Sequence, residues 1–332
     1  MSAPRIRITI VAMSVITMIL FLIDIASGSV SIAPIEVFDV LLGRDCDPST
    51  RTIILNIRLV KAVVALMAGA ALAVSGLQMQ TLFRNPLAGP YVLGISSGAS
   101  LGVALFVLGA PILGIAGTWM WLGTAGAAWI GAFAVLLLMA LVSVRLKDIM
   151  VVLILGIMVS SGISAVVQIL QFLSQEDALK SYVMWTMGSL SSVTTVQLWV
   201  LVPAVLLGLV MAVATVKPLN MLLFGEEYAV TMGLSLHRAR GLIFGSTTLL
   251  AGTVTAFCGP IGFIGLAMPH VARMLTGSAD HRVLVPASLL CGASSVLLCD
   301  VLASSFILPV NAVTALLGIP VVIYVLFKAA RG

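Results

Sequence analysis

One short pattern in the sequence has the spacing of a catalytic nucleophile. Residues 94–98 read Gly-Ile-Ser-Ser-Gly, which fits the G-x-S-x-G pattern that holds a serine on a strand-to-helix turn in soluble hydrolases. Such a serine needs a base, and the chain offers His237, His270 and His281. No strand pattern precedes Ser96 and no sequence feature brings a histidine beside it. A hydrolase therefore stays open only as an alternative.

Metal and nucleotide chemistry have no comparable pattern. The three histidines form no HExxH or similar pair, and the four cysteines have neither metal-ligand nor disulfide spacing. The chain also carries no G-x-x-x-x-G-K-[ST] sequence, so P-loop hydrolysis of ATP is excluded. We expect no metal site, no cofactor and no enzymatic activity in this chain.

The elements that must position these residues are membrane helices. Hydrophobic residues make up 61% of the 332 residues and charged residues 9%, with a mean hydropathy of +1.22. A soluble domain is about half apolar and a quarter charged. We therefore expect an all-α polytopic membrane protein, with residues 1–332 forming a single transmembrane domain. Apolar runs that can cross the bilayer recur near residues 7–27, 53–82, 92–109, 117–143, 149–172, 193–214, 240–257, 263–275, 284–306 and 311–328.

The distribution of basic residues predicts the orientation. Ten spans put both termini on one side, and most of the 17 lysines and arginines fall on that side. The exceptions are Arg44, Arg51, Arg58, Lys61 and Lys180. The positive-inside rule then makes both termini cytoplasmic and residues 28–52 an outer loop, which we expect to contain a short helix. Basic cytoplasmic loops account for the net charge of +5 without a nucleic-acid partner.

Two segments interrupt the apolar chain with glycine and proline. The first contains Asn85-Pro86 and Gly89-Pro90, and the second begins at Gly259-Pro260. Each proline breaks a helix, and non-helical backbone survives in lipid only where protein or water covers it. The interruptions fall at the same place in spans two to five and seven to ten, which enter the membrane from opposite sides. This pattern predicts inverted-topology halves around a translocation path.

Glycine spacing predicts close helix packing beside the first interruption. Gly94, Gly98 and Gly102 recur every fourth residue and so share one face, which lets a neighbouring helix approach closely. We expect Gly241 and Gly245 to act in the same way at the start of span seven.

Residues 217–240 form the longest polar stretch on the cytoplasmic side. Glu226 and Glu227 favour the start of a helix, Gly233 its end, and Ser235 the cap of a second short helix that runs into span seven. Two short surface helices would give a docking surface for a soluble partner.

Three long segments carry a resemblance to a known family. They read QMQTLFRNPLAGPYVLGISSGAS (78–100), GEEYAVTMGLSLHRAR (225–240) and GPIGFIGLAMPHVARMLTGSADHRVLVP (259–286). The chain resembles the FecCD-like permease subunits of type II ABC importers over nearly its whole length. The resemblance implies a homodimer of ten-helix subunits in the bacterial inner membrane. It also implies two cytoplasmic ATPase subunits and a periplasmic substrate-binding protein as partners.

The resemblance also implies three sets of site residues. The cytoplasmic gate would comprise Asn85, Leu87, Ile149 and Met150, although family members can carry small hydroxyl residues in place of the last two. The ATPase-coupling residues would be Gly225, Glu226, Glu227, Ala229, Gly233, Leu234 and Arg238. Docking of the binding protein would use Arg58 and Lys61, the latter in place of a second arginine of the family motif.

The family transports iron-siderophore complexes, haem and cobalamin. An iron chelate or haem is the substrate we expect, with cobalamin as the alternative. An ion-coupled secondary transporter is a further alternative, which would need ionisable groups near the bilayer centre. The only acidic residues within spans are Asp24 and Asp300, and both lie towards the outer ends.

Overall fold

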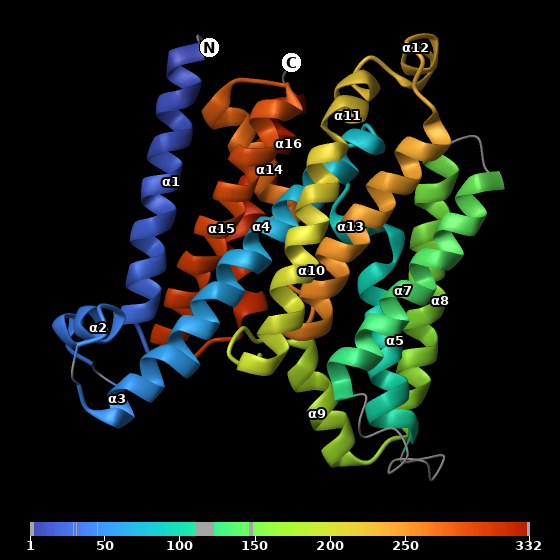
Figure 1. Cartoon of the computed structure of the whole chain (residues 1–332). Coiled ribbons are helices and arrows are strands. Elements are labelled where there is room, and N and C mark those ends of the chain that lie inside the picture. The colour runs from blue at the N-terminus through green and yellow to red at the C-terminus, as the bar shows by residue number, and fades with distance from the viewer. Residues whose placement is uncertain are drawn as a thin grey trace.

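The chain forms a bundle of long helices with both termini at one end. The computed structural model describes residues 3–28, 30, 32–44, 46–110, 123–145 and 149–330, and this part of the chain contains no strand. Figure 1 shows α11 (Val216–Leu222) and α12 (Glu226–Thr231) at the same end as the termini. The short helices α2 (Pro34–Leu41), α3 (Pro48–Thr52) and α9 (Glu176–Thr186) lie at the opposite end.

The ten predicted spans correspond to ten helices. These are α1 (Ala3–Ala26), α4 (Leu59–Leu82), α5 (Ile95–Ala104), α7 (Gly123–Arg145), α8 (Ile149–Leu173), α10 (Thr195–Ala214), α13 (Leu236–Cys258), α14 (Ile264–Thr276), α15 (His281–Phe306) and α16 (Val310–Ala330). The structure confirms an all-helical architecture, and six helices within the described ranges are long and apolar enough to cross a membrane by themselves. The start of the predicted span 117–143 lies outside the described residues.

Several connections differ from the sequence-based expectations. The outer loop holds two short helices, α2 and α3, and α3 continues through a π-helical turn (Ile53–Arg58) into α4. The helix α9 was not predicted. Ser235 makes no capping hydrogen bond with its side chain, and no separate helix precedes span seven, because α13 begins directly at Leu236.

The two halves of the bundle pack in the same way. In the first half, α5 contacts α7 and α8; in the second, α14 contacts α15 and α16. Across the halves, α4 packs on α15 and α14, whereas α13 packs on α7 and α5. In this comparison α4 corresponds to α13, α5 to α14, α7 to α15 and α8 to α16. Replacing each helix by its counterpart reproduces the same set of contacts, as the predicted inverted repeat requires.

The two short inner helices start after a backbone reversal at corresponding positions. Gly94, with φ of 77°, immediately precedes α5, and Phe263, with φ of 65°, immediately precedes α14. Glycine adopts this left-handed conformation without steric cost, whereas a phenylalanine is strained there. Each interruption thus ends at a sharp turn from which a short helix, α5 or α14, continues.

Glycine contacts hold the halves together. A Cβ atom added to Gly76 of α4 would lie 1.6 Å from the carbonyl oxygen of Gly265 in α14, and one on Gly69 would lie 2.2 Å from that of Gly292 in α15. The two helix pairs therefore touch backbone to backbone. We call these contacts the glycine seam.

The glycines named from spacing behave differently from one another. Gly98 and Gly102 contact the backbone of α7 closely, as expected, and Gly94 faces Ser160 and Val135 side chains. The expectation for Gly241 was wrong, because a Cβ atom there would meet nothing within 4 Å; one on Gly245 would lie 3.2 Å from the Met211 side chain.

Candidate translocation path and coupling surface

The two interruptions meet in the middle of the molecule. The hydroxyl of Tyr91, in the first, donates to the carbonyl oxygen of Ile261, in the second, over 3.0 Å. Residues of both segments line one cavity of about 330 Å³: Leu87, Gly89, Pro90, Tyr91, Val92, Phe263, Gly265 and Leu266. None of these side chains carries a charge, so the cavity is an open, mainly apolar pocket between the two broken segments.

The predicted gate residues are only partly brought together here. The Asn85 side chain accepts a hydrogen bond from the backbone N–H of Leu87 over 2.9 Å, which fixes the turn, and Leu87 is half-exposed on the cavity. Ile149 is buried in the hydrophobic core and Met150 is exposed, and neither lines this cavity. A gating role for the four residues stays a prediction.

Polar side chains that the sequence did not assign to the path hold the first interruption and α4 against α14. The Nε2 atom of His270 lies 2.8 Å from the carbonyl oxygen of Pro86. Gln80 of α4 donates to the carbonyl oxygen of Leu266 over 2.9 Å and accepts from Arg273 over 2.7 Å. The sequence feature that could have indicated these contacts is the pair of glutamines, Gln78 and Gln80, inside an otherwise apolar span.

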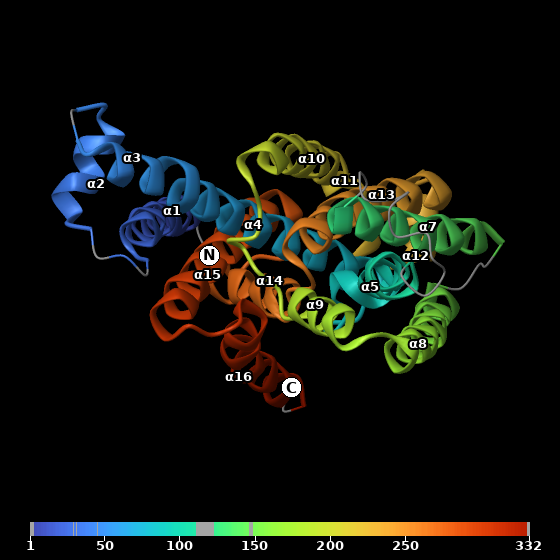
Figure 2. The same ribbon diagram turned by 90° about the horizontal axis from the view of Figure 1, so that it is seen from below.

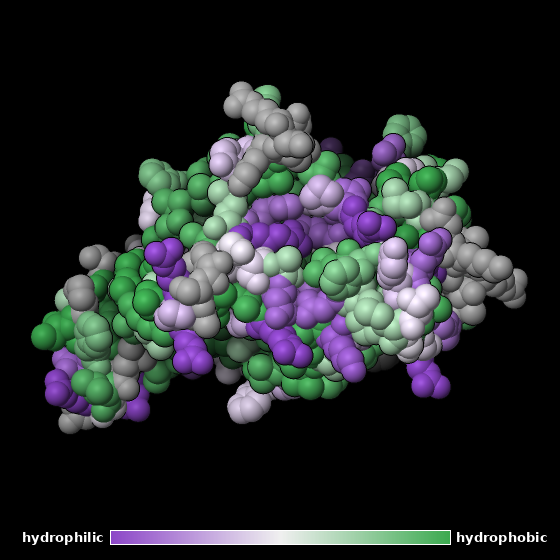
Figure 3. Space-filling model, turned by 90° about the horizontal axis from the view of Figure 1, so that it is seen from above, coloured by the Kyte–Doolittle hydropathy of each residue, from purple (hydrophilic) through white to green (hydrophobic). Residues whose placement is uncertain are grey.

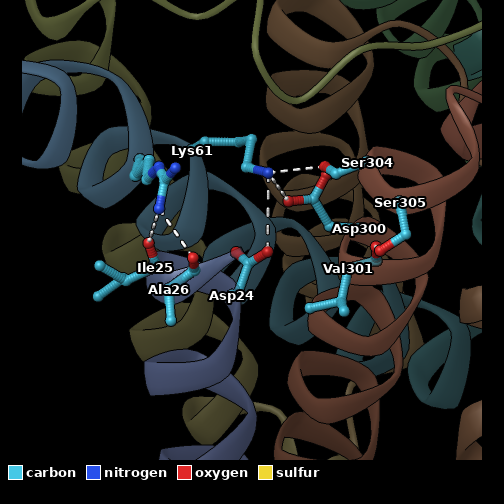
Figure 4. A network of polar contacts seen from close by, with 9 residues as sticks. Asp24, Ile25, Ala26, Lys61, Asp300, Val301, Ser304 and Ser305 are labelled. Carbon is cyan, nitrogen blue, oxygen red and sulfur yellow. Dashed lines mark hydrogen bonds and ion pairs between the residues drawn. The ribbon is translucent and has the colours of Figure 1, made fainter. Parts of the chain in front are cut away.

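At the opposite end, Lys61 lies in a buried cluster of charges (Figure 4). Its Nζ atom is 2.8 Å from Asp300 Oδ2, 3.7 Å from Asp24 Oδ1 and 2.8 Å from the Ser304 hydroxyl. These residues tie α1, α4 and α15 together. One ammonium group faces two carboxyl groups, so the cluster carries more acidic than basic groups.

Arg58 is also engaged within the chain. Its guanidinium donates to the carbonyl oxygens of Ile25, Ala26 and Val30, at the C-terminal end of α1 and just beyond it. A cation at this position pairs with the unsatisfied carbonyls of the helix. Arg58 is 4% exposed and Lys61 8%. The docking role of these two residues is untested, but neither side chain extends freely from the surface.

The predicted coupling region forms a protruding surface at the other end. Gly225 and Gly233 flank α12 with φ of 101° and 88°, so glycines set its two ends. Ala229 is buried and Glu227 is exposed. Exposed apolar side chains Tyr228, Val230 and Met232 lie on or just after α12. Seen from this end, hydrophilic side chains form a band across the surface between apolar flanks (Figure 3).

An ion pair joins α12 to the long helix behind it. Arg240 of α13 donates to both carboxylate oxygens of Glu226, over 2.8 and 2.9 Å. Leu234 follows the turn at Gly233 and is partly buried in the core, and Arg238 is exposed. Of the predicted set, Glu226 is therefore an internal brace, whereas Glu227 and Arg238 face outwards.

A second connection joins α11 to the start of α15 and, through His281, to α4. Asn220 of α11 donates to Asp280 over 2.7 Å and accepts from the backbone N–H of His281 over 2.9 Å. The backbone N–H of Arg282 also donates to Asp280 and holds the pKa of that exposed carboxyl below its usual range. His281 in turn lies 2.8 Å from the Thr81 hydroxyl of α4.

Comparisons with known proteins agree with this arrangement. The permease YvrB of Bacillus subtilis, an uncharacterized ABC transporter permease protein, is 35% identical over 326 residues, covering 94% of this chain and 91% of its own. The vitamin B12 import system permease BtuC of Shigella sonnei is 35% identical over 327 residues, covering 97% of this chain and 95% of its own.

Solved structures share the fold. An inward-facing metal-chelate type ABC transporter superposes with a TM-score of 0.84 at 29% identity, covering 96% of this chain and 98% of that one. PsaBC from Streptococcus pneumoniae, in complex with Fab, matches with a TM-score of 0.56 at 19% identity over 79% of this chain and 89% of its own, which shows the fold alone.

The model of the FecCD transport family matches residues 16–328. With eight of its ten long helices arranged as inverted halves, and with relatives that are ABC transporter permeases, this multi-pass membrane chain belongs to the FecCD transport family.

Proposed function

We propose that this chain is the permease of an ATP-driven importer that carries a metal chelate from a periplasmic binding protein to the cytoplasm. The observation that supports it best is the meeting of two glycine-and-proline interruptions, entered from opposite faces, around the apolar cavity of Leu87 and Phe263. An iron-siderophore complex or haem is the substrate class we propose, with cobalamin as the alternative suggested by the relative BtuC.

The path would lie on the face between α8 and α16. Seen from the outer end, both helices project from the same side of the bundle, with α9 and α14 between them (Figure 2). The helix α8 is largely exposed, and its exposed residues include the polar Ser161, Ser164 and Gln168. Polar side chains are costly against lipid. We therefore propose a homodimer in which this face of one subunit meets the same face of the other.

The end that carries α12 would be cytoplasmic and would receive the ATPase. Exposed Glu227 and Arg238 and the apolar side chains of α12 suit an interface with a soluble protein. Because Glu226 is tied to α13, and Asn220 to α15, movement of a bound ATPase would reach the bundle as rigid-body displacement of these helices. The chain itself would hydrolyse no ATP.

The binding protein would dock at the outer end, near α2, α3 and the corner formed by Arg58 and Lys61. The exposed Arg51 and Lys180 offer further positive charge at this end. Electrostatic attraction of acidic residues on a partner would then steer association.

Reconstitution into liposomes tests the proposal. The permease, its own ATPase and its own binding protein should accumulate radiolabelled chelate only when ATP is supplied, and omission of any component should abolish uptake. Uptake by the permease alone, driven by an ion gradient, would instead establish a secondary transporter.

A further inference from the structure

A second cavity lies on the outer side of the interruptions. It measures about 290 Å³ and is lined by residues of α5, α8 and α9 together with Pro260 of the second interruption: Ser96, Ser97, Ser100, Ile163, Ser164, Val167, Gln168, Gln171, Tyr182 and Pro260. We call it the polar cavity. It differs from the Leu87 cavity in having mostly hydroxyl and amide groups on its wall. A substrate arriving at the α9 end would meet the polar cavity first.

Hydrogen bonding within the wall is incomplete. Ser164 donates back to the carbonyl oxygen of Ser160 over 2.9 Å, and the hydroxyls of Ser100 and Tyr182 bond to each other. Within the described part of the chain, no hydrogen bond satisfies the side chains of four other wall residues: Ser96, Ser97, Gln168 and Gln171.

Other glutamines in spans behave differently. Gln78 of α4 bonds to Thr215, Ser246 and Thr247, so its amide is fully used inside the protein. Buried amides normally find such partners, whereas Gln171 is half-buried and Gln168 is exposed, so neither amide is held inside the protein. The two amides and two hydroxyls of the polar cavity are thus available to a bound molecule, as donors and as acceptors.

The walls of both cavities lack charged side chains. No wall residue of either is Asp, Glu, Lys or Arg. An anion entering from water would lose hydration without gaining a counter-charge, which is expensive at low dielectric constant. A neutral molecule would lose only the hydration of its polar groups, and the free amides and hydroxyls would replace it.

We propose that the polar cavity, which is open on one side, receives an edge of a neutral, amide- or hydroxyl-bearing chelate through Gln168, Gln171, Ser96 and Ser97, and that it disfavours polyanionic chelates. This inference rests on the proposed function and narrows the substrate class: neutral ferric hydroxamates and amide-rich corrinoids fit the wall, whereas tris-catecholate complexes and dicarboxylate haem do not.

Direct binding to the permease–ATPase complex tests this, because the binding protein would impose its own selectivity. Complex in lipid nanodiscs, without binding protein, is titrated with a neutral ferric tris-hydroxamate and with a trianionic ferric tris-catecholate. The neutral probe should bind at least about tenfold more tightly, since hydrogen bonds compensate its desolvation. Equal binding, tighter binding of the trianion, or no binding of either probe would overturn the inference.

Variants make the test specific. The double change Gln168→Leu and Gln171→Leu should weaken binding of the neutral probe by about tenfold, and Gln168→Lys should shift preference towards the trianion. Ser305→Ala is the matched control: Ser305 is exposed on α15, lies outside the cavity wall and, like Ser164, donates to a carbonyl oxygen of its own helix, that of Val301. Unchanged binding in the double variant would reject the assignment of these residues.

The same samples separate this inference from the proposed function. ATPase activity stimulated by the binding protein is measured in parallel. If stimulation is present but the charge preference is not, the inference fails and the importer stands. If neither stimulation nor uptake occurs with all partners present, the proposed function itself fails.

Discussion

The ammonium group of Lys61 on α4 lies 2.8 Å from the carboxylate of Asp300 on α15, and a second carboxyl, that of Asp24 on α1, approaches it from the other side at 3.7 Å. Asp24 is fully buried. The helices α1, α4 and α15 therefore depend on one cation at the end of the bundle that carries α2 and α3.

Loss of this cation should destabilise the fold. Lys61→Met leaves two buried carboxyl groups without a counter-charge, a change that costs about 3–5 kcal/mol when one partner of a buried pair is removed. The midpoint of thermal unfolding in detergent should fall clearly. Adding Asp300→Asn to the variant should recover part of the loss, while exposed Lys180→Met serves as the control. An unchanged midpoint in Lys61→Met would show that the cluster contributes nothing to stability.

Docking of the binding protein should depend on positive charge at the outer corner. Changing Arg58 and Lys61 together to Glu should weaken docking at low salt, with the difference shrinking as ionic strength rises above about 0.15 M. Because these two side chains are buried and also hold the fold, the exposed pair Arg51→Glu and Lys180→Glu tests the surface charge without removing internal contacts. Affinity is measured by surface plasmon resonance. Arg58→Met separates charge loss from charge reversal. A lowered thermal midpoint with unchanged low-salt affinity would mean that both residues act only inside the fold.

Coupling should require the brace between α12 and α13. Glu226→Gln removes the ion pair with Arg240, so α12 should tilt independently and uptake should fall more than ATPase turnover does. The ratio of substrate transported to ATP hydrolysed gives the measurement. Exchanging the charges, with Glu226→Arg and Arg240→Glu, should restore much of the ratio. A ratio that Glu226→Gln leaves intact would rule out transmission through this contact.

The glycine seam should tolerate no side chain. Gly76→Ala places a methyl group 1.6 Å from the Gly265 carbonyl oxygen, so backbone must move. Overpacking typically costs about 1–3 kcal/mol, and rigid backbone puts this site at the upper end or above it. Gly162→Ala and Gly241→Ala are matched controls with open space around them, and should be neutral or slightly stabilising in a helix. Equal yields and midpoints for all three variants would contradict the close contact.

Ser96 should not behave as a nucleophile. It sits in the first turn of α5, on the wall of the polar cavity, and that wall contains no histidine. His270 and His281 contact Pro86, Thr81 and Asn220 instead. Ser96→Ala should lower uptake by no more than about threefold, the loss of one hydrogen bond. Abolished function in a correctly assembled complex would favour the hydrolase alternative.

The sequence predicted the architecture well because its strongest signals are physical necessities of a bilayer. Apolar runs long enough to span lipid located the helices within a few residues, and the prolines at 86, 90 and 260 marked where the helices break. Gly98 and Gly102 also predicted close packing correctly, since the same face of α5 meets α7.

Side-chain pairing was less accessible to prediction. Nothing in the sequence shows that Lys61 meets Asp24 and Asp300, because those residues come from opposite ends of the chain and the contact depends on helix rotation. Gly241 looked like a contact glycine by spacing yet faces open space, so periodicity alone did not reveal which face is covered. The helix α9 was missed because it is short and mixed in polarity.

The glycine seam also restricts how the molecule can change shape. Where main chain presses on main chain, no flexible side chain is present to absorb a shear, so α4, α14 and α15 must travel as one solid block. Relative movement is then expected between this block and the helices that lie outside the glycine seam. A transporter built in this way can acquire a new substrate through substitutions in α8 and α9, while the packing of α4, α14 and α15 stays the same.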